Sequence, residues 1–451
     1  MGSKSIFPYK LWGLGRVDTV KLKCYPTSRV LFVVEKPLGV EETVVFEPLG
    51  NLRGEGQKMK EYRVGILGFG MIGKVHAYGY AALPFLSEPA PLRARIVRVA
   101  TSRPDTAQQA AQVLGCEGVT DPRRITEAED IDIVHICTPN HLHGEAILSA
   151  MAHGKHIYCD KPLVARWAEA QQILAALPRY RGISQMTFHN RFFPATLRAK
   201  QLVEEGRLGR VLQFRALYLH SGSARPETPL RWKLSAEAGG GVVADLASHL
   251  LDLVWHLLGD FQQVWTHSQI AFPFRPAAEN PQRRVPVEAE EAVWILARMQ
   301  NGAEGLIEAS KLATGAEDEL RLEVHGTEGA IRFSLMDPHH LGFYDARSPE
   351  HPCGGQRGWL LIDAGHRYPA PATEFPARKA VIGWTRAHGE CLAHFLRGVA
   401  SGQPVQPDLF QGVYVQHLID RVQQSARTGQ WTPVIPRETL ADFPPPDQGK
   451  E

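Results

Sequence analysis

A glycine-rich turn between an apolar strand and a helix constrains this chain more than any other feature. Residues 64–67 are apolar or small, which is typical of a short buried strand, and a helical pattern begins near residue 72. Between them lies a G-x-G-x-x-G sequence made of Gly68, Phe69, Gly70, Met71, Ile72 and Gly73. A strand, this turn and a helix in that order predict a βαβ unit whose helix N-terminus faces a phosphate.

Each glycine of the turn meets a different steric need. Gly68 permits the tight turn, Gly70 leaves room for a pyrophosphate, and Gly73 lets the helix pack closely on the strand. The N–H groups at the helix start and the helix dipole both favour a negatively charged ligand. A glycine-rich turn without a ligand is the alternative, but the flanking elements favour a dinucleotide site.

The end of the second strand, residues 95–100, bears on the identity of the dinucleotide. In NAD-binding folds this strand usually ends in an acid that binds the adenosine ribose. Here the strand is followed by Thr101, Ser102 and Arg103, and Asp105 comes too late in the sequence to fit comfortably. A hydroxyl and a guanidinium suit a 2′-phosphate, so the sequence favours NADP over NAD. The alternative is that Arg103 stacks on adenine or caps the next helix.

Alternating strand and helix patterns continue from residue 59 to residue 184, which predicts parallel βαβ units. Beyond them, longer two-fold alternating strands follow, and Asn301-Gly302 is a hairpin signal between two of these. We therefore expect an α/β protein with a doubly wound, parallel Rossmann domain over 59–184. An α+β domain with an open, mostly antiparallel sheet should occupy 185–451. The segments expected to form surface loops are 271–286 and 348–377.

The first 58 residues do not continue this pattern. They contain β-like stretches at 30–34 and 43–46, followed by a glycine-containing linker. Met59 is followed almost at once by the first strand of the α/β domain. One interpretation therefore takes 1–58 as an upstream extension or a mis-assigned start, and the other takes it as a genuine N-terminal arm.

Composition argues against several kinds of partner. Lysine plus arginine number 50 and aspartate plus glutamate 48, and this balance does not favour nucleic acid or an anionic membrane surface. The sequence contains no uninterrupted apolar run of about 18 residues, so no transmembrane helix is predicted, and the N-terminus lacks a signal-peptide pattern. Six scattered cysteines without a C-x-x-C pair are typical of reduced thiols in a cytoplasmic protein.

Two strand ends of the predicted parallel sheet carry polar residues that should face the cofactor. Strand 156–159 is followed by Asp160 and Lys161, which places the lysine at the carboxyl edge of the sheet. A lysine in a loop is more often a solvated surface group, but this edge is where ligands bind. Strand 131–136 is followed by a polar turn that should form a wall of the nicotinamide site, and its residues are Thr138, Pro139, Asn140 and His143.

A second ionisable group lies on a predicted helix. Asp245 and His249 are four residues apart and should share one helix face, which continues to Asp252 and His256. A purely structural helix would avoid such a stripe, although a helical Asp–His pair is often only a satisfied hydrogen bond. Zinc is a further alternative, but no cysteine joins these residues and an active-site role explains them without a metal, so no metal is expected.

Together these motifs resemble the Gfo/Idh/MocA oxidoreductase family, which includes glucose–fructose oxidoreductase and inositol dehydrogenases. The resemblance covers residues 60–434 and rests on several motifs in order. They are the glycine turn at 68–73, T-P-N-x-x-H at 138–143, Asp160-Lys161-Pro162 where the family has E-K-P, Asn190-Arg191-Phe192-Phe193-Pro194, a G-G-G…D-x-x-x-H segment ending at His249, and Gly326-Thr327-Glu328-Gly329. Aspartate in place of the glutamate keeps the charge but shortens the reach, and 348–377 resembles an insertion.

The resemblance implies an NAD(P)-dependent oxidoreductase that acts on a sugar, a cyclitol or a related polyol bound between two domains. It implies that Lys161 and His249 handle the proton during hydride exchange, and we expect Asp245 to orient the imidazole. It also implies a cis Lys161–Pro162 bond and a homo-oligomer, dimer or tetramer, built through the second sheet. Candidate substrate contacts, for which a packing role is equally open, are His189, Asn190, Arg191, Trp232 and Lys233. The alternatives are an NAD-dependent glycoside hydrolase of the same fold and a non-catalytic sensor.

Overall fold

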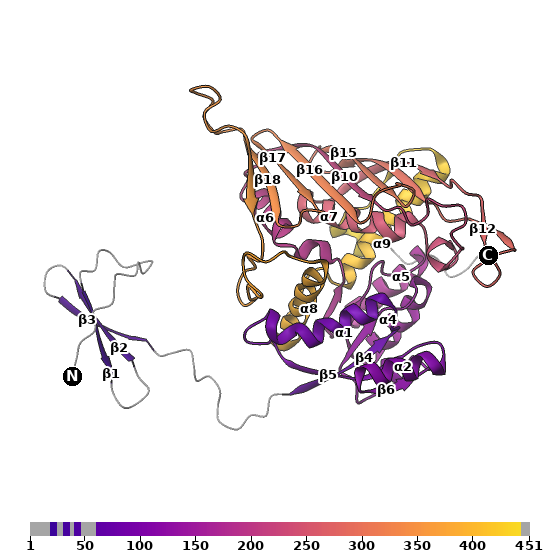
Figure 1. Cartoon of the computed structure of the whole chain (residues 1–451), viewed down its shortest axis with the longest axis horizontal. Coiled ribbons are helices and arrows are strands. Elements are labelled where there is room, and N and C mark those ends of the chain that lie inside the picture. Colours follow the sequence, from indigo (N-terminus) through magenta and orange to yellow (C-terminus); the bar gives the residue numbers. More distant parts are fainter. Residues whose placement is uncertain (1–18, 25–29, 37–39, 47–59, 443–451) are drawn as a thin grey trace. The chain divides into compact units, whose positions relative to one another are not determined.

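The computed structural model describes residues 19–24, 30–36, 40–46 and 60–442. It divides into two compact units, Met1–Lys60 and Glu61–Glu451. In the first unit an antiparallel sheet is formed by β1 (Thr19–Cys24), β2 (Val30–Lys36) and β3 (Val40–Phe46), as Figure 1 shows. The strands β2 and β3 confirm the two β-like stretches, whereas β1 is a strand that the sequence analysis does not predict.

The unit Glu61–Glu451 begins with a six-stranded parallel sheet in the order β6-β5-β4-β7-β8-β9, which confirms the doubly wound Rossmann prediction. Its strands are β4 (Glu61–Leu67), β5 (Arg93–Ala100), β6 (Glu117–Val119), β7 (Ile133–Ile136), β8 (His156–Cys159) and β9 (Ser184–Met186). The strand order reverses between β4 and β7. Ligands of such sheets bind outside the carboxyl ends of the strands at this reversal.

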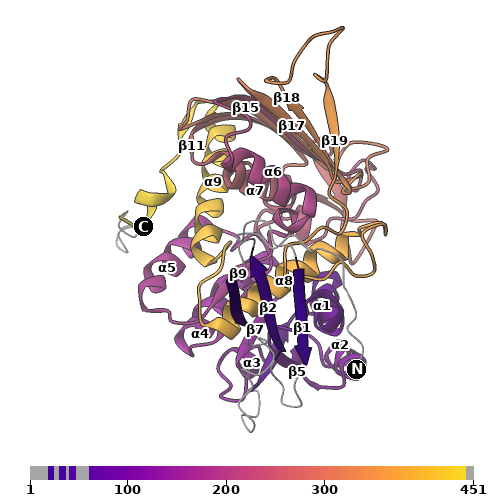
Figure 2. The same ribbon diagram turned by 90° about the vertical axis from the view of Figure 1, so that its left-hand side faces the viewer.

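Both faces of the parallel sheet are covered, because its strands alternate their apolar side chains between two buried clusters. Val64 and Ile66 of β4 belong to one cluster, and Leu67 belongs to the other. The first cluster also contains residues of α1 (Met71–Leu86) and α8 (Trp384–Ser401), which pack together (Figure 2). Helix α8 therefore covers the Rossmann sheet, although the sequence boundaries put its residues in the second domain. The other face is covered by α4 (His143–Ala152) and α5 (Trp167–Ala176).

The second domain contains a nine-stranded sheet in the order β19-β18-β17-β16-β10-β15-β14-β11-β20. Only β10 and β15 pair in parallel, so the sheet is mostly antiparallel, as predicted. The helices α6, α7 and α9 lie on the face turned toward the Rossmann sheet (Figures 1 and 2). The elements are α6 (Pro194–Glu204), β10 (Val211–Leu219), α7 (Ser248–Leu258), β11 (Phe261–Gln269), β14 (Ala292–Met299), β15 (Glu304–Ser310), β16 (Glu319–Gly326), β17 (Gly329–Ser334), β18 (His340–Asp345), β19 (Trp359–Asp363), α9 (Leu409–Thr428) and β20 (Thr432–Pro433).

The turns of this sheet test the local predictions. Gly302 has a φ of +84° in the hairpin between β14 and β15, which confirms the Asn301-Gly302 turn. The segments predicted to be loops are more ordered: 271–286 contains the hairpin β12 (Phe274–Pro276)–β13 (Arg284–Pro286), and 348–377 contains β19. Among the helices of the described residues, none combines the length and apolar composition needed to cross a membrane.

Candidate active site

The glycine turn leaves the start of α1 open to a ligand. Gly68 has a φ of +85°, and a Cβ there would lie 2.6 Å from the carbonyl oxygen of Cys137. A Cβ on Gly73 would lie 2.2 Å from the carbonyl oxygen of Gly68, so the helix packs directly on the turn. A Cβ on Gly70 would meet nothing within 4 Å, and this N-cap residue has no side-chain cap. This open, uncapped helix start fits the pyrophosphate of a dinucleotide.

The end of β5 carries charge of both signs. Arg103 donates from Nε to Oδ1 of Asp105 at 3.2 Å, and both side chains are exposed. The hydroxyl of Thr101 contacts the hydroxyl of Thr106 at 2.6 Å, and Ser102 is exposed beside this pair in the sequence. Asp105 thus lies in the first turn of α2 (Pro104–Leu114), beyond the strand end, and pairs there with Arg103.

The two polar turns after β7 and β8 are tied together by His143. One ring nitrogen of the buried His143, Nε2, lies 2.9 Å from the carbonyl oxygen of Thr138, and the other lies 3.1 Å from that of Pro162. Asn140 donates from Nδ2 to the carbonyl oxygen of Gly239 at 2.7 Å, which joins this wall to the second domain. His143 thus holds the turn from its buried side, and Thr138 and Pro139 form its more exposed part.

Lys161 lies where the two domains meet. The bond to Pro162 is cis, which confirms what the family resemblance implies. The Lys161 ammonium donates to the main-chain oxygen of Asp245 at 2.6 Å and to its Oδ1 at 3.3 Å. The neighbouring Asp160 accepts a hydrogen bond from the hydroxyl of Thr187 at 2.6 Å, so its carboxylate is held inside the Rossmann domain.

The carboxylate of Asp245 contacts three ammonium groups. Besides Lys161, it pairs with Lys233 through Oδ1 at 3.2 Å and with Lys311 through Oδ2 at 3.0 Å. Burial alone would raise the pKa of Asp245, but the charges of Lys161, Lys311 and Lys233 hold it well below 3.8. The carboxylate is therefore ionised throughout the physiological pH range.

His249 is buried at the start of α7 and belongs to a group of aromatic rings. Its ring centroid lies 5.2 Å from that of His189, edge to face, and 5.8 Å from that of Tyr218. Burial lowers the pKa of His249 well below 6.5, and the charge of Lys161 lowers it further. The imidazole is therefore neutral near pH 7 and has a lone pair that can accept a proton.

The hydrogen bond from the His249 imidazole to the Asp245 carboxylate that we expect from their spacing is not among the interactions of the described residues. Instead, Asp245 faces the lysines, and Nδ1 of His249 is buried without a hydrogen-bond partner in that part of the chain. The reason is local: Val243–Ala247 form a π-helix, η5, ahead of α7. Its hydrogen bonds run from residue i to residue i+5, so Asp245 and His249 are not related by one regular α-helical turn.

Comparison with known proteins agrees with this geometry. Residues 62–188 match the family model described as oxidoreductase family, NAD-binding Rossmann fold, and residues 200–434 match the oxidoreductase family C-terminal alpha/beta domain. The chain belongs to the Gfo/Idh/MocA oxidoreductase family. It is therefore an oxidoreductase with an NAD-binding Rossmann domain, and this membership favours the enzymatic prediction over a sensor.

Individual relatives cover most of the chain. Levoglucosan dehydrogenase of Pseudarthrobacter phenanthrenivorans is 32% identical over 393 residues, which are 83% of this chain and 99% of that protein. The scyllo-inositol 2-dehydrogenase (NAD(+)) of Bacillus subtilis is 28% identical over 64% of this chain and 78% of its own length. A solved structure of levoglucosan dehydrogenase in complex with NADH and L-sorbose superposes with a TM-score of 0.80, at 32% identity, over 84% of this chain and 100% of that chain. The names of these relatives give no support to the glycoside hydrolase alternative.

The five candidate substrate contacts fall into two groups in this family member. Arg191 donates from Nε to Oδ2 of Asp252 at 2.7 Å, and its Nη1 lies 3.2 Å from Nδ1 of His256. Because the Arg191 and Asp252 side chains are 5% and 2% exposed, the geometry favours a structural ion pair over a substrate contact. The others lie nearer the cluster. Lys233 pairs with Asp245, Trp232 lies beside Lys233, and His189 lies beside His249. The amide of Asn190 is buried and has no hydrogen-bond partner among the described residues.

Two residues near this cluster are absent from the sequence-based prediction. Lys311 follows β15 directly and is buried against Asp245. His388 of α8 stacks on His189 with ring centroids 3.9 Å apart. For Lys311, its position directly after a buried strand was a usable signal. No sequence signal identified His388, because α8 reaches the site only through the tertiary fold.

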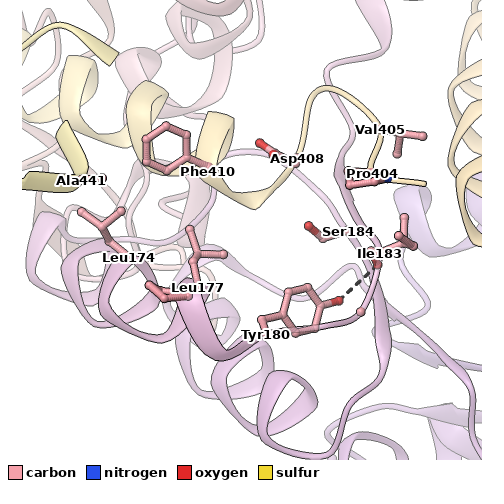
Figure 3. Close-up of a pocket in the computed structure, with 12 residues that line it drawn as sticks. Leu174, Leu177, Tyr180, Ile183, Ser184, Pro404, Val405, Asp408, Phe410 and Ala441 are labelled. Atoms are coloured by element: carbon pink, nitrogen blue, oxygen red, sulfur yellow. Dashed lines mark hydrogen bonds between the residues drawn. The ribbon is translucent and has the colours of Figure 1, made fainter. Parts of the chain in front are cut away.

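The described residues offer little for other chemistry. They contain no group of three or more histidine, cysteine, aspartate or glutamate side chains placed to hold a metal ion. Figure 3 shows a separate pocket of about 370 Å³, lined mainly by apolar side chains such as Leu177 and Phe410. The Tyr180 hydroxyl in this pocket donates to the carbonyl oxygen of Ile183 at 3.1 Å and is thus satisfied. None of the residues that line the pocket belongs to the Lys161–Asp245–His249 cluster.

Proposed function

We propose that this chain oxidises a secondary alcohol of a sugar, a cyclitol or a related polyol, and catalyses the reverse reduction. The observation that carries the proposal is the meeting of Lys161, at the carboxyl end of a Rossmann strand, with Asp245 on the helix that carries His249. This edge of the sheet is where the nicotinamide of a bound dinucleotide lies. The relatives named levoglucosan and scyllo-inositol dehydrogenases support a polyhydroxylated substrate.

The chain supplies the proton chemistry of this reaction. His249, neutral near pH 7, accepts the hydroxyl proton of the substrate. The Lys161 ammonium donates a hydrogen bond to the same oxygen and stabilises the negative charge that develops on it. Asp245 holds Lys161 in place through two hydrogen bonds rather than orienting the imidazole. The bound nicotinamide cofactor supplies the hydride acceptor.

NAD is the cofactor that we now favour, in place of the sequence-based preference for NADP. A 2′-phosphate near Arg103 would also lie near Asp105, whose carboxylate pairs with this guanidinium and repels a phosphate. The relative from Bacillus subtilis is named for NAD(+), and the superposed levoglucosan dehydrogenase is a complex with NADH. The sequence-based preference for NADP is untested, and a direct comparison of kcat/KM with the two cofactors decides between them.

The decisive experiment is a panel of sugars, anhydrosugars and inositols, each incubated with NAD or NADP while absorbance is followed at the nicotinamide band. We expect stoichiometric cofactor reduction with at least one polyol, and a higher kcat/KM with NAD than with NADP. Turnover without net cofactor reduction would instead indicate a glycosidase-type cycle. Binding of NADH without turnover of any polyol would contradict the proposal.

An oligomer built through the second sheet is also a proposal. Several strands of this sheet expose apolar side chains, among them Leu212, Leu296 and Leu361. Apolar side chains on a sheet face without covering helices are typical of an interface between protein chains. Light scattering coupled to size-exclusion chromatography should give a mass of two or four chains, and the mass of one chain would contradict this proposal.

A further inference from the structure

An excess of positive charge surrounds Asp245. Lys161, Lys233 and Lys311 contact one carboxylate at 3.3, 3.2 and 3.0 Å. Lys233 is half exposed to solvent, but the side chains of Lys161 and Lys311 are only 12% and 7% exposed. Buried ammonium groups are costly unless they are paired, and here a single aspartate serves both.

Lys311 reaches this cluster from the sheet of the second domain. It follows β15, and its main-chain N–H donates to the carbonyl oxygen of Glu291 at 2.9 Å, which fixes its backbone. Its ammonium contacts Oδ2 of Asp245 at 3.0 Å, Lys161 contacts Oδ1, and the half-exposed Lys233 reaches both oxygens at 3.2 and 3.4 Å. Lys311 is thus the buried partner of Oδ2, as Lys161 is of Oδ1.

We propose that Lys311 is a positioning residue of this dehydrogenase: it fixes the Asp245 carboxylate so that Lys161 is held on the reacting oxygen, and its positive charge favours the unprotonated form of the His249 imidazole, which accepts the substrate proton. The proposal rests on the proposed function. It assigns to Lys311 a part in the reaction, exerted through Asp245 and without contact to the substrate.

The groups around Lys311 support this role. The charged groups that act on it are Asp245, Lys233 and Lys161, and it in turn acts on the carboxyl of Glu290. Burial raises the pKa of Glu290, which also accepts the N–H of Val243 through Oε1 at 3.0 Å, so Glu290 is a poor source of compensating charge. Burial lowers the pKa of Lys311, and Asp245 opposes that shift. Lys311 therefore depends on the same carboxylate as Lys161.

Removing this ammonium has two consequences. Oδ2 of Asp245 loses its buried partner, so the carboxylate turns and Lys161 is held only by its bond to the main-chain oxygen of Asp245. The site also loses one positive charge, so the His249 imidazole retains a proton to a higher pH, because a nearby positive charge disfavours protonation. Loss of position lowers kcat, whereas loss of charge shifts the pH dependence, and a purely structural lysine would produce no shift.

The test compares Lys311→Met and Lys311→Arg with a matched control, Lys155→Met. Lys155 is equally buried, but its ammonium donates to the main-chain oxygens of Ala128 and Ile131 in the Rossmann domain. For Lys311→Met we expect the lower-pH limb of kcat/KM for polyol oxidation to move up by about one pH unit, with the Kd for NADH unchanged. Lys311→Arg should restore the wild-type profile, and Lys155→Met should change stability only.

Each other outcome decides against a distinct claim. A Lys311→Met enzyme that binds NADH and has the wild-type pH profile overturns the role of Lys311. If Lys311→Met no longer binds NADH, Lys311→Gln, which keeps a polar group at this position, is measured in the same way. If the wild type turns over no polyol, the proposed function fails, and an NMR titration of the His249 imidazole in the NADH complex still tests whether Lys311→Met moves its titration to a higher pH.

Discussion

At the scale of single residues, the charge of one carboxylate organises the groups that we propose to be catalytic. Asp245 is ionised, and its partners come from the end of β8, from the segment at Lys233 and from the end of β15. His249 lies on the same helical segment but remains neutral because it is buried. In the proposed mechanism, the acid–base pair therefore separates into a positively charged lysine cluster, which stabilises negative charge on oxygen, and a neutral imidazole, which accepts the proton.

Replacing Lys161 with alanine tests this division at the residue scale. The variant loses the ammonium that stabilises the substrate oxygen, so kcat should fall by about 10²–10³-fold, as for the loss of one oxyanion donor. The Kd for NADH, measured by fluorescence, should stay near the wild-type value, because the glycine turn is untouched. Lys155→Met serves as a control with kcat near wild type. A Lys161→Ala enzyme with wild-type kcat would show that another group stabilises the oxygen.

At the scale of elements, the start of α1 separates binding from packing. The carbonyl oxygen of Gly68 lies against Gly73, where any side chain must collide with the backbone, whereas Gly70 faces open space. The backbone of Gly70 has a φ of −73°, which every L-residue can adopt. The two glycines are therefore required for different reasons, although they belong to one motif.

Substitutions at these two glycines should affect two different properties, NADH affinity and stability. Gly70→Val places a side chain where the pyrophosphate approaches, so we expect the Kd for NADH to rise by about tenfold or more at an unchanged unfolding temperature. Gly73→Val should lower the free energy of unfolding by about 1–3 kcal/mol, since its Cβ collides with the carbonyl oxygen of Gly68. Calorimetry and fluorescence titration measure the two quantities. Equal loss of NADH affinity without destabilisation in both variants would contradict this assignment.

At the scale of the whole unit Glu61–Glu451, buried histidines make stability depend on pH. Burial lowers the pKa of His76 to about 4, of His417 to about 3 and of His394 to about 4. In the unfolded chain a histidine has a pKa of about 6.5, so below this pH the unfolded state binds more protons than the folded state. The stability that these neutral rings confer is complete above pH 6.5 and is lost as the pH falls toward each folded-state value.

Acidification from pH 7 to pH 5 should therefore destabilise the protein. Each histidine that remains neutral in the folded state should lower the free energy of unfolding by about 2 kcal/mol at pH 5. Denaturant unfolding at several pH values measures the slope. His417→Gln should reduce the slope by the equivalent of one proton. The amide oxygen of the glutamine can still accept the hydrogen bond of the Ile435 N–H, which in the wild type donates to Nε2 of His417 at 3.1 Å. An unchanged slope in His417→Gln would contradict this origin.

Local pattern was sufficient for the elements that neighbouring residues determine. The apolar run and glycines at 64–73 predicted the first strand, the turn and the helix, and Asn301-Gly302 predicted its hairpin, because these features depend on backbone sterics within a few residues. The spacing of Asp245 and His249 was misleading, because it assumed α-helical geometry where η5 has π-helical geometry. The sequence alone left Arg191 open to a substrate contact, because it does not show that Asp252 of α7 lies beside Arg191.

The sequence by itself determined the fold class, the dinucleotide turn and the position of Lys161 at the carboxyl edge of the sheet, because the polypeptide encodes these features in contiguous segments. Only the tertiary structure decided which charges meet. Lys311 and His388 come from β15 and α8, far along the chain from Lys161, and they reach the site through the packing of the second sheet and of α8. The proton affinity and position of a buried group depend on such distant neighbours, since charge and burial act through space rather than along the sequence.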